Sequence, residues 1–503
     1  MTTSLAEAAA QHWDLLVVGG GTAGIVGART AASFGVTVLL VESHRTGGDC
    51  LWTGCVPSKS LLAAAHTVAN VRRASELGVF VGEVSVDFAA VMRHVCAAIA
   101  AIEPTDSVAA LEQAGVSVLR GRARMAARRV GTEVSAGADV EVDGRRISSR
   151  QVLLATGADP SMPDLPGLRA ARAWTSETIW DLDRLPERLT VVGGGSIGCE
   201  LGQAFARLGS RVTLLEMAQR LLPSEDPDAS AAVTAALVAD GVDVRTGTGL
   251  EEVTGDVDLG SVRTSGGASI DHDGLLVALG RRPRTADLGL DEAGVGRDEH
   301  ANVRVDASLR STTNPRVWAA GDLTGHPQFT HVAGVHASTA ASNAVLGLRR
   351  AAAATAVPRV TYTDPEVASV GIPTVPVDAA GHTGVEMITR QHVEVDRAIT
   401  EGRTEGFARL AVDGKGRIVG ATVVGPRAGE TLPELVLAVR HGLRTRDLAG
   451  VMHPYPTYAD GPWNAAVADV RSRLSAPAAR RVTDAAVRAR RRWLDLRGQR
   501  SSR

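Results

Sequence analysis

Two cysteines, Cys50 and Cys55, lie five positions apart in the segment GGDCLWTGCVPSK and could form a redox-active pair. In a regular helix this separation would place the two side chains about 140° apart around the axis. A disulfide between them therefore requires an irregular turn, which Gly54 and Pro57 favour. A thiol at the start of a helix has a lowered pKa and is more often the reactive thiolate. The alternatives are two buried free thiols, or half of a metal site whose other ligands are not evident.

A glycine pattern occurs twice in the chain, each time after a short apolar strand and before a helical stretch. The first copy reads LLVVGGGTAG at residues 15–24, and the second reads LTVVGGGSIG at residues 189–198. In each copy a second apolar strand ends in an acid 23 residues after the first glycine. The residues concerned are Gly19, Gly21, Gly24 and Glu42 in the first copy, and Gly193, Gly195, Gly198 and Glu216 in the second.

This pattern is typical of the βαβ unit that binds a dinucleotide. The first glycine permits a tight turn, the second lets the backbone approach a pyrophosphate, and the third lets the helix lie close to the strand. The pyrophosphate then meets the free N–H groups at the helix N-terminus, and the acid accepts hydrogen bonds from a ribose. Two purely structural turns are the alternative. Two dinucleotide sites in one chain indicate hydride transfer between a nicotinamide and a flavin.

The rest of the sequence alternates strand and helix patterns before changing in texture. Strands are expected where apolar runs end in small residues and glycine, at Leu153–Gly157, Leu275–Gly280 and Val317–Asp322. An Ala-rich link, Leu348–Pro358, is followed by a β-like segment from Arg359 to about Val424 and by a helical pattern at Leu432–His441. The sequence therefore predicts an α/β fold with two Rossmann-like dinucleotide-binding domains and a C-terminal α+β domain.

Composition excludes several classes of protein. The 503 residues carry a formal net charge of −2, so nothing indicates a nucleic-acid partner. Residues 1–13 have neither a basic start nor a continuous apolar core, and no secretory signal is expected. We expect no transmembrane helix and a cytoplasmic location. The two other cysteines, Cys96 and Cys199, lie in apolar helix-like settings and are predicted to be inert core residues.

Together these motifs resemble the pyridine nucleotide-disulfide oxidoreductases, which include glutathione reductase, dihydrolipoamide dehydrogenase and mercuric reductase. The resemblance covers about residues 12–465 and rests on the two glycine loops, GGDCLWTGCVPSK, ATG, GRRP, AAGD, TDPEVASVG and a late Pro-Thr. The pairing of GGDC with GCVPSK is most similar to the mercuric reductase branch. The resemblance divides the chain into an FAD-binding domain (1–157 and 282–350), an NAD(P)-binding domain (158–281), a dimerisation domain (351–472) and a basic helical tail (473–503).

The resemblance also implies roles for individual residues. Cys50 would be the interchange thiol that meets the substrate, and Cys55 would be the thiolate beside the flavin. Lys59 would pair with Glu200 near flavin N5. The implied cofactors are FAD and NADH or NADPH, with further binding positions at Gly48, Gly157, Gly280, Asp322 and Thr330. A homodimer would share its active sites between subunits.

The C-terminal motif departs from the family pattern. Glutathione reductase and dihydrolipoamide dehydrogenase carry His-Pro-Thr followed by a Glu, whereas residues 452–460 here read MHPYPTYAD. Alignment on the Pro-Thr pair places Tyr455 at the histidine and Asp460 at the acid, with His453 two residues away. Tyrosine also occurs in this region of mercuric reductases. We expect a phenol–carboxylate hydrogen bond between Tyr455 and Asp460, with a packing tyrosine at the dimer interface as the alternative.

Several small-molecule electron acceptors are compatible with the sequence. The missing histidine argues against a glutathione or lipoamide substrate, because proton transfer to dithiols uses it. Mercury reduction is also in question, because mercuric reductases carry a C-terminal cysteine pair and this sequence has no cysteine after Cys199. Quinones or small disulfides fit as well. A flavin redox sensor with little turnover is the alternative from another class.

Two further expectations concern the nicotinamide and the tail. Glu216 favours NADH over NADPH, since a carboxylate accepts from the ribose 2′-OH and repels a 2′-phosphate, although Arg220 lies close by. After Pro477 a helix is expected with one apolar stripe and an arginine-rich remainder. It would either dock on its own dimer or make a weak contact with a membrane surface. The stripe consists of Val482, Ala486, Ala489, Trp493 and Leu496.

Overall fold

The computed structural model describes residues 3–127, 138–374 and 384–501, and the chain divides into two compact units. Unit 1 comprises Met1–Leu222 and Leu237–Ala354, and unit 2 comprises Pro223–Ala236 and Thr355–Arg503. Each unit has its own sheets and its own hydrophobic core.

The first glycine loop belongs to the largest sheet of unit 1, whose described strands follow the order β3-β2-β1-β6-β5-β4, with β16 also paired to β6. Strands β3, β2, β1, β6 and β16 run parallel, and β5 and β4 are antiparallel additions. The bounds are β1 His12–Val18, β2 Val38–Glu42, β3 Val116–Arg120, β4 Ala123–Met125, β5 Ala138–Val142, β6 Arg145–Leu154 and β16 Val317–Ala319. Parallel strands are buried on both faces, which explains why their sequences are continuous apolar runs.

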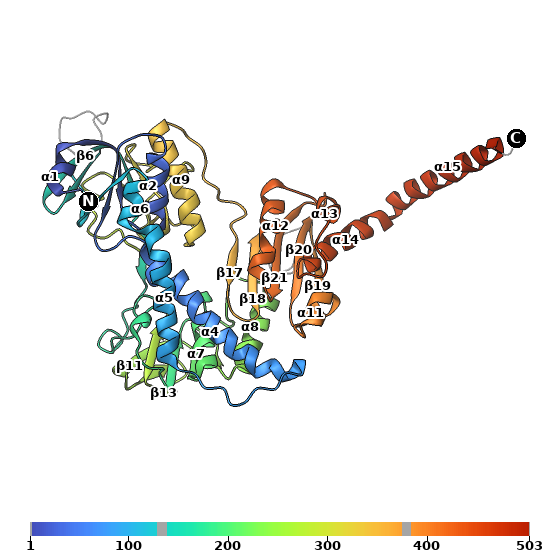
Figure 1. Cartoon of the computed structure of the whole chain (residues 1–503), viewed down its shortest axis with the longest axis horizontal. Coiled ribbons are helices and arrows are strands. Elements are labelled where there is room, and N and C mark those ends of the chain that lie inside the picture. Colours follow the sequence, from blue (N-terminus) through green and yellow to red (C-terminus); the bar gives the residue numbers. More distant parts are fainter. Residues whose placement is uncertain (1–2, 128–137, 375–383, 502–503) are drawn as a thin grey trace. The chain divides into compact units, whose positions relative to one another are not determined.

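Helices cover this sheet and extend from it. Helix α2 (Thr22–Ala32) follows β1 and packs against α9 (Thr330–Leu346) through small residues (Figure 1). Gly27 lies at this contact, where a Cβ would come within 2.5 Å of Leu153. The remaining helices of this part are α1 Leu5–Ala10, α3 Gly48–Trp52, α4 Cys55–Arg73, α5 Phe88–Asp106 and α6 Val108–Gln113.

The second glycine loop lies in a parallel sheet of order β10-β9-β8-β14. Its strands are β8 Arg188–Val192, β9 Arg211–Leu215, β10 Asp243–Arg245 and β14 Gly274–Val277, and α7 (Ser196–Leu208) follows β8. Numbered by their order along the chain, the four strands of this sheet lie in the order third, second, first and last. The strands β3, β2, β1 and β6 of the first sheet lie in the same order. The internal repeat predicted from the sequence is therefore confirmed as a repeat of topology. Two small sheets, β11 Leu250–Gly255 with β12 Gly260–Thr264 and β13 Ser269–His272, and β7 Ala158–Pro160 with β15 Arg281–Pro283, complete unit 1.

Unit 2 is built on an antiparallel sheet of order β17-β18-β21-β20-β19. Helices α12 and α14 pack on it, with Leu432, Leu435, Ala465 and Ala466 in the core. The bounds are β17 Arg359–Thr361, β18 Glu366–Gly371, β19 Val385–Gln391, β20 Phe407–Asp413, β21 Ile418–Gly425, α8 Pro227–Ala239, α11 Asp396–Thr400, α12 Ala428–His441, α13 Thr445–Ala449, α14 Asp460–Ser475 and α15 Pro477–Ser501. The predicted α+β character of this region and the predicted helix after Pro477 are both confirmed.

Two sequence expectations remain predictions. The stretch Phe88–Gln113, which spans α5 and α6, is long and apolar enough to cross a membrane by length and composition alone, and it carries charged residues such as Arg93 and Glu103. In this fold α5 packs against α4 and buries Phe88, Met92 and Val95. The domain boundaries proposed from the sequence at residues 157, 281, 350 and 472 remain a prediction.

Candidate active site

The two cysteines lie on either side of a break between two helices. Cys50 is in α3 and Cys55 is the first residue of α4, and Gly54 between them adopts φ −121° and ψ −107°. A Cβ on Gly54 would lie 2.8 Å from the backbone oxygen of Asp49, so the chain can fold back here only because the position is glycine. The break brings the two thiols within hydrogen-bonding distance of each other. The irregular turn expected from the sequence is confirmed.

The surroundings of the thiols favour one of them as thiolate. The hydrogen bond from Cys50 is the largest cause that lowers the pKa of Cys55, to about 6, and the Thr330 hydroxyl and the Lys59 charge lower it further. The Thr330 oxygen lies 3.3 Å from the Cys55 sulfur. The same hydrogen bond, together with burial, raises the pKa of Cys50. At neutral pH the reduced pair therefore consists of a Cys55 thiolate and a Cys50 thiol.

An ion pair lies next to the thiols and joins the two βαβ repeats of unit 1. Lys59, one turn after Cys55 on α4, donates a 2.9 Å hydrogen bond to the Glu200 carboxylate on α7. The Glu200 side chain is only 7% exposed. A carboxylate buried to this degree is stable in its charged form only beside a cation, so the pair holds the Lys59 ammonium close to Cys55.

Both glycine loops have the shape that a pyrophosphate requires. A Cβ on Gly24 would lie 1.8 Å from the Gly19 oxygen, and a Cβ on Gly198 would lie 1.8 Å from the Gly193 oxygen. The N-cap residues of helices α2 and α7 are Gly21 and Gly195, which have no side chain to cap the first N–H groups. These donors are available to an anion. In the first loop Gly48 also faces Gly21, and a Cβ on Gly48 would lie 2.6 Å from the Gly21 Cα.

The strand-end acids are held in equivalent positions. One Glu42 oxygen accepts a 2.6 Å hydrogen bond from the Gly20 N–H, and one Glu216 oxygen accepts a 2.6 Å hydrogen bond from the Gly194 N–H. Each carboxylate is therefore fixed beside its loop, where a dinucleotide ribose would lie. Arg220 donates to the Leu222 carbonyl oxygen.

An ionic cluster connects the turn before Cys50 with the predicted cofactor positions. The Arg281 guanidinium contacts the Asp49 carboxylate, and its Nε lies 3.5 Å from Asp322. Burial is the main cause that raises the pKa of Asp322, and Arg281 opposes it. The predicted cofactor positions Gly157 and Gly280 both have a positive φ. Sequence reasoning missed Asp49 and Arg281, although the GGDC and GRRP motifs contain them.

The C-terminal motif lies in unit 2, where the structure gives its residues different partners from those expected. The Tyr455 hydroxyl donates to Asp396, which raises the pKa of the phenol, and the side chain is 73% exposed. Asp460 instead accepts a 3.0 Å hydrogen bond from the Thr457 N–H at the start of α14. The expected bond between Tyr455 and Asp460 is therefore wrong. His453 lies 2.9 Å from Glu434 with its side chain largely buried, so the tyrosine is the more accessible group.

The two remaining cysteines differ in their environment. Cys199 is buried in α7 as predicted, and burial raises its pKa. Cys96 is exposed on α5, so its predicted core position is wrong; an apolar neighbourhood in the sequence does not show which side of a helix faces the core.

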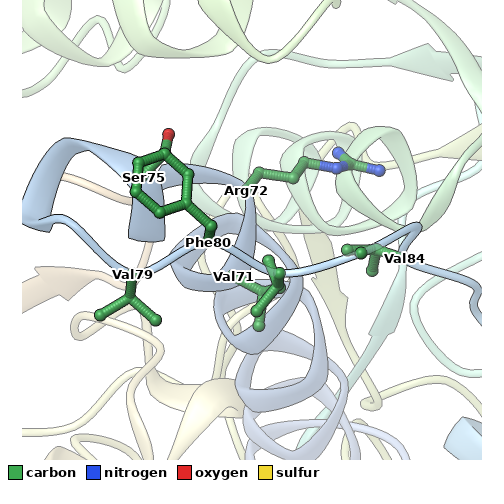
Figure 2. Close-up of a pocket in the computed structure, with 8 residues that line it drawn as sticks. Val71, Arg72, Ser75, Val79, Phe80 and Val84 are labelled. Carbon is green, nitrogen blue, oxygen red and sulfur yellow. The ribbon is translucent and has the colours of Figure 1, made fainter.

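The pocket drawn in Figure 2 contains none of the predicted site residues. It lies at the C-terminal end of α4, lined by Val71, Arg72, Ser75, Val79, Phe80, Val81, Gly82 and Val84.

Comparison with protein families gives two matches that together span most of the chain. Residues 13–337 match the pyridine nucleotide-disulphide oxidoreductase family, and residues 357–466 match the dimerisation domain of the same family. The chain belongs to the pyridine nucleotide-disulfide oxidoreductases.

Its similarity to individual members of the family extends over nearly the whole chain. It is 36% identical to a mercuric reductase of Streptomyces lividans, covering 89% of this chain and 94% of the relative. It is 32% identical to a dihydrolipoyl dehydrogenase of Chlamydia muridarum, covering 94% of this chain and 100% of the relative. Among solved structures, LpdA from Mycobacterium tuberculosis matches with a TM-score of 0.81 at 28% identity, covering 90% of this chain and 99% of that one.

Family membership establishes the general chemistry and assembly. Pyridine nucleotide-disulfide oxidoreductases of this type use FAD and NAD(P)H, and this chain is an FAD-dependent oxidoreductase. Its C-terminal domain supports a homodimer. The two glycine loops, with their uncapped helix N-termini, fit two dinucleotides.

The hydrogen bond between the thiols leads to a testable prediction about the pKa of Cys55. In the reduced protein, thiolate ultraviolet absorbance should appear with a midpoint near pH 6, assigned to Cys55. Cys50→Ala removes the largest cause of the lowered pKa, so the midpoint should rise toward the ordinary thiol value of about 8.5. Thr330→Val should raise it less, with Thr330→Ser as the control that keeps a hydroxyl. A Cys96→Ser background removes the signal of the exposed thiol. An unchanged midpoint in Cys50→Ala would contradict the assignment.

Proposed function

We propose that the protein passes electrons from NAD(P)H through FAD to the Cys50–Cys55 pair and from there to a small-molecule acceptor. The observation that carries this proposal is the thiol pair across the helix break, with Cys55 as the more acidic thiol. Reduction of the Cys50–Cys55 disulfide takes two electrons and one proton. It breaks the sulfur–sulfur bond and leaves a thiol on Cys50 and a thiolate on Cys55. Cys50 then acts as the interchange thiol, and Cys55 lies on the flavin side.

The residues of unit 1 are assigned to the two cofactors as follows. FAD, when bound, supplies the means to accept a hydride and pass on two electrons. The Lys59 ammonium, held by Glu200, keeps a positive charge at the thiolate and the flavin edge. The proposed FAD positions are Gly19, Gly21, Gly24, Glu42, Gly48, Lys59, Gly157, Asp322 and Thr330. The proposed NAD(P) positions are Gly193, Gly195, Gly198, Glu216 and Gly280.

The acceptor class follows from the C-terminal motif. We assign Tyr455 of the partner subunit to the substrate side of Cys50, supported by the exposure of this side chain and by the burial of His453. A phenol whose pKa is raised by a carboxylate is a poor base at neutral pH. Because the Tyr455 proton is donated to Asp396, the hydroxyl offers its oxygen lone pairs as a contact for a metal ion or another acceptor. An acceptor that takes up electrons without protons, such as a soft metal ion, therefore fits best, and a quinone, whose reduction consumes two protons, is the second candidate. The mercuric reductase relatives favour the metal ion, and the dihydrolipoyl dehydrogenase relative favours a disulfide.

Two serine variants test the proposed path. Cys55→Ser should lose the long-wavelength charge-transfer absorbance that appears on two-electron reduction, because the thiolate donor is gone. Cys50→Ser should keep that absorbance and lose turnover with disulfides. The measurement is stopped-flow reduction by NADH, then reoxidation with Hg(II), lipoamide, glutathione and mycothiol disulfides, and quinones. If both variants reduce every acceptor at the wild-type rate, the protein is a flavin-only reductase. If wild type is reduced but no acceptor reoxidises it, the redox-sensor alternative is favoured.

NADH should be preferred over NADPH because Glu216 is fixed beside the second loop. A hydrogen bond to a charged group contributes about 1.5–3 kcal/mol, so Glu216→Ala should lower kcat/KM for NADH by at least about tenfold. The matched variant is Glu42→Ala, which should weaken FAD binding and leave the choice of nicotinamide unchanged. A wild-type kcat/KM ratio in favour of NADPH would overturn this assignment.

The role of Tyr455 is tested by removing only its hydroxyl. Tyr455→Phe should leave flavin reduction by NADH normal and slow the oxidative half-reaction at least about tenfold, the loss of one hydrogen bond to a charged or developing group. His453→Ala is the control, and it should have a small effect on that half-reaction. If His453→Ala abolishes turnover while Tyr455→Phe does not, the histidine is the working residue and the motif alignment is wrong.

Two further parts of the proposal concern where the enzyme acts. The cytoplasmic location remains a prediction. We also propose a weak contact between the basic C-terminal tail and a membrane surface, supported by the exposure of all but one of the described side chains of α15.

A further inference from the structure

Helix α15 gains almost no packing from the unit to which it belongs. It follows α14 as a long separate helix (Figure 1). From Pro477 to Arg497, the part of α15 whose side chains are described, every residue except Ala479 is exposed. Tertiary packing normally supplies most of the stability of a helix in a protein, so a helix exposed on all sides is expected to have an external partner.

The faces of α15 differ in chemistry. At about 100° per residue, the five stripe residues from Val482 to Leu496 fall within about 80° of the circumference. Arginines flank this stripe, with Arg490 and Arg497 on one side and Arg481 and Arg492 on the other. The opposite face carries Arg480 and Arg491 together with the two acids, Asp484 and Asp495.

The charge of the helix and the setting of Trp493 indicate the kind of partner. Residues 477–497 contain seven arginines and two aspartates, a net charge of 7 − 2 = +5. The guanidinium of Arg490 lies 4.1 Å from the centre of the Trp493 ring, and that of Arg497 lies 4.4 Å from it. Both arginines therefore lie beside the aromatic ring of the apolar stripe, and the acids lie away from it.

We propose that α15 binds the anionic surface of a lipid bilayer through the stripe centred on Trp493. Tryptophan favours the headgroup level of a bilayer, and flanking arginines can reach lipid phosphates while the stripe enters the interface. The confinement of both acids to the far face is what such an orientation requires. A nucleic acid would attract the same charge but would not need an apolar stripe between the arginines.

A homodimer carries two copies of α15. When both copies reach the same bilayer, binding of the first makes binding of the second intramolecular, and two weak helices then give measurable attachment of the dimer. This inference rests on the membrane contact of the tail proposed above and is independent of the assigned electron path, so loss of lipid binding with normal turnover, or the reverse, tells the two apart.

The experiment uses the full-length FAD-loaded dimer and sedimentation with phosphatidylcholine vesicles, with or without phosphatidylglycerol. Wild type should bind the anionic vesicles at least tenfold more tightly than the neutral ones. A chain that ends at Ala476 should lose this binding and keep its NADH-dependent turnover. Two double variants with the same change in charge test the orientation: Arg490→Gln with Arg497→Gln beside the stripe, and Arg480→Gln with Arg491→Gln on the far face.

The proposal requires the two double variants to differ. The first pair should weaken binding to anionic vesicles at least tenfold, and the second pair less than threefold. Trp493→Ala, which leaves the charge unchanged, should also weaken binding at least tenfold. The proposal would be overturned if the two double variants lost vesicle binding equally and Trp493→Ala bound vesicles as tightly as wild type. Such a result would show that α15 is attracted to any polyanion without a preferred orientation. Unchanged vesicle binding after truncation, or equal binding to neutral vesicles, would also overturn the proposal.

Discussion

The arrangement of the redox site depends on one backbone constraint, the break between α3 and α4 at Gly54. A side chain there would collide with the Asp49 carbonyl oxygen, and a continuous helix would turn the two cysteines away from each other. With the break, Cys55 becomes the first residue of a 19-residue helix and receives a hydrogen bond from Cys50. The same restart of the helix directs Lys59, one turn later, toward Glu200. Thiol geometry, thiolate charge and the ion pair therefore all follow from one glycine.

Unit 1 uses the same solution twice to hold a dinucleotide. Both glycine loops bring a helix so close to a strand that a Cβ at Gly24 or Gly198 would overlap a backbone oxygen. In both loops a strand-end carboxylate accepts a hydrogen bond from the N–H of the residue after the first glycine, Gly20 in one loop and Gly194 in the other. The two repeats meet where α4 packs on α7, and the Lys59–Glu200 pair lies at that contact. The two dinucleotide folds thus share one ion pair beside the thiol pair, which is the arrangement that the proposed electron transfer requires.

The features that the sequence predicts well are local in the chain. The glycine loops, their acids and the cysteine pair each lie within about one βαβ unit, so spacing alone reveals them. The missed features are contacts between residues distant in sequence. Arg281 contacts Asp49, which lies 232 positions away in the sequence. The Tyr455 hydroxyl donates to Asp396, which lies 59 positions away, and not to the nearby Asp460. The sequence wrongly predicts burial of Cys96 because an alanine-rich helix has no strong polar face to indicate its orientation.

The long-range contact of Tyr455 also bears on the proposed acceptor site. A bond to Asp460 would have held the phenol against the start of α14. Asp460 is instead occupied by the Thr457 N–H, and the phenol extends to Asp396 with most of its ring exposed. Since the carboxylate of Asp396 accepts the phenol proton and raises the pKa of the phenol, proton removal is harder and the hydroxyl presents its oxygen lone pairs outward. An arrangement of this kind suits the positioning of an acceptor better than the shuttling of protons to it. On this proposal a metal ion, which is reduced without protons, is separated in chemical terms from disulfides and quinones, whose reduction consumes two protons.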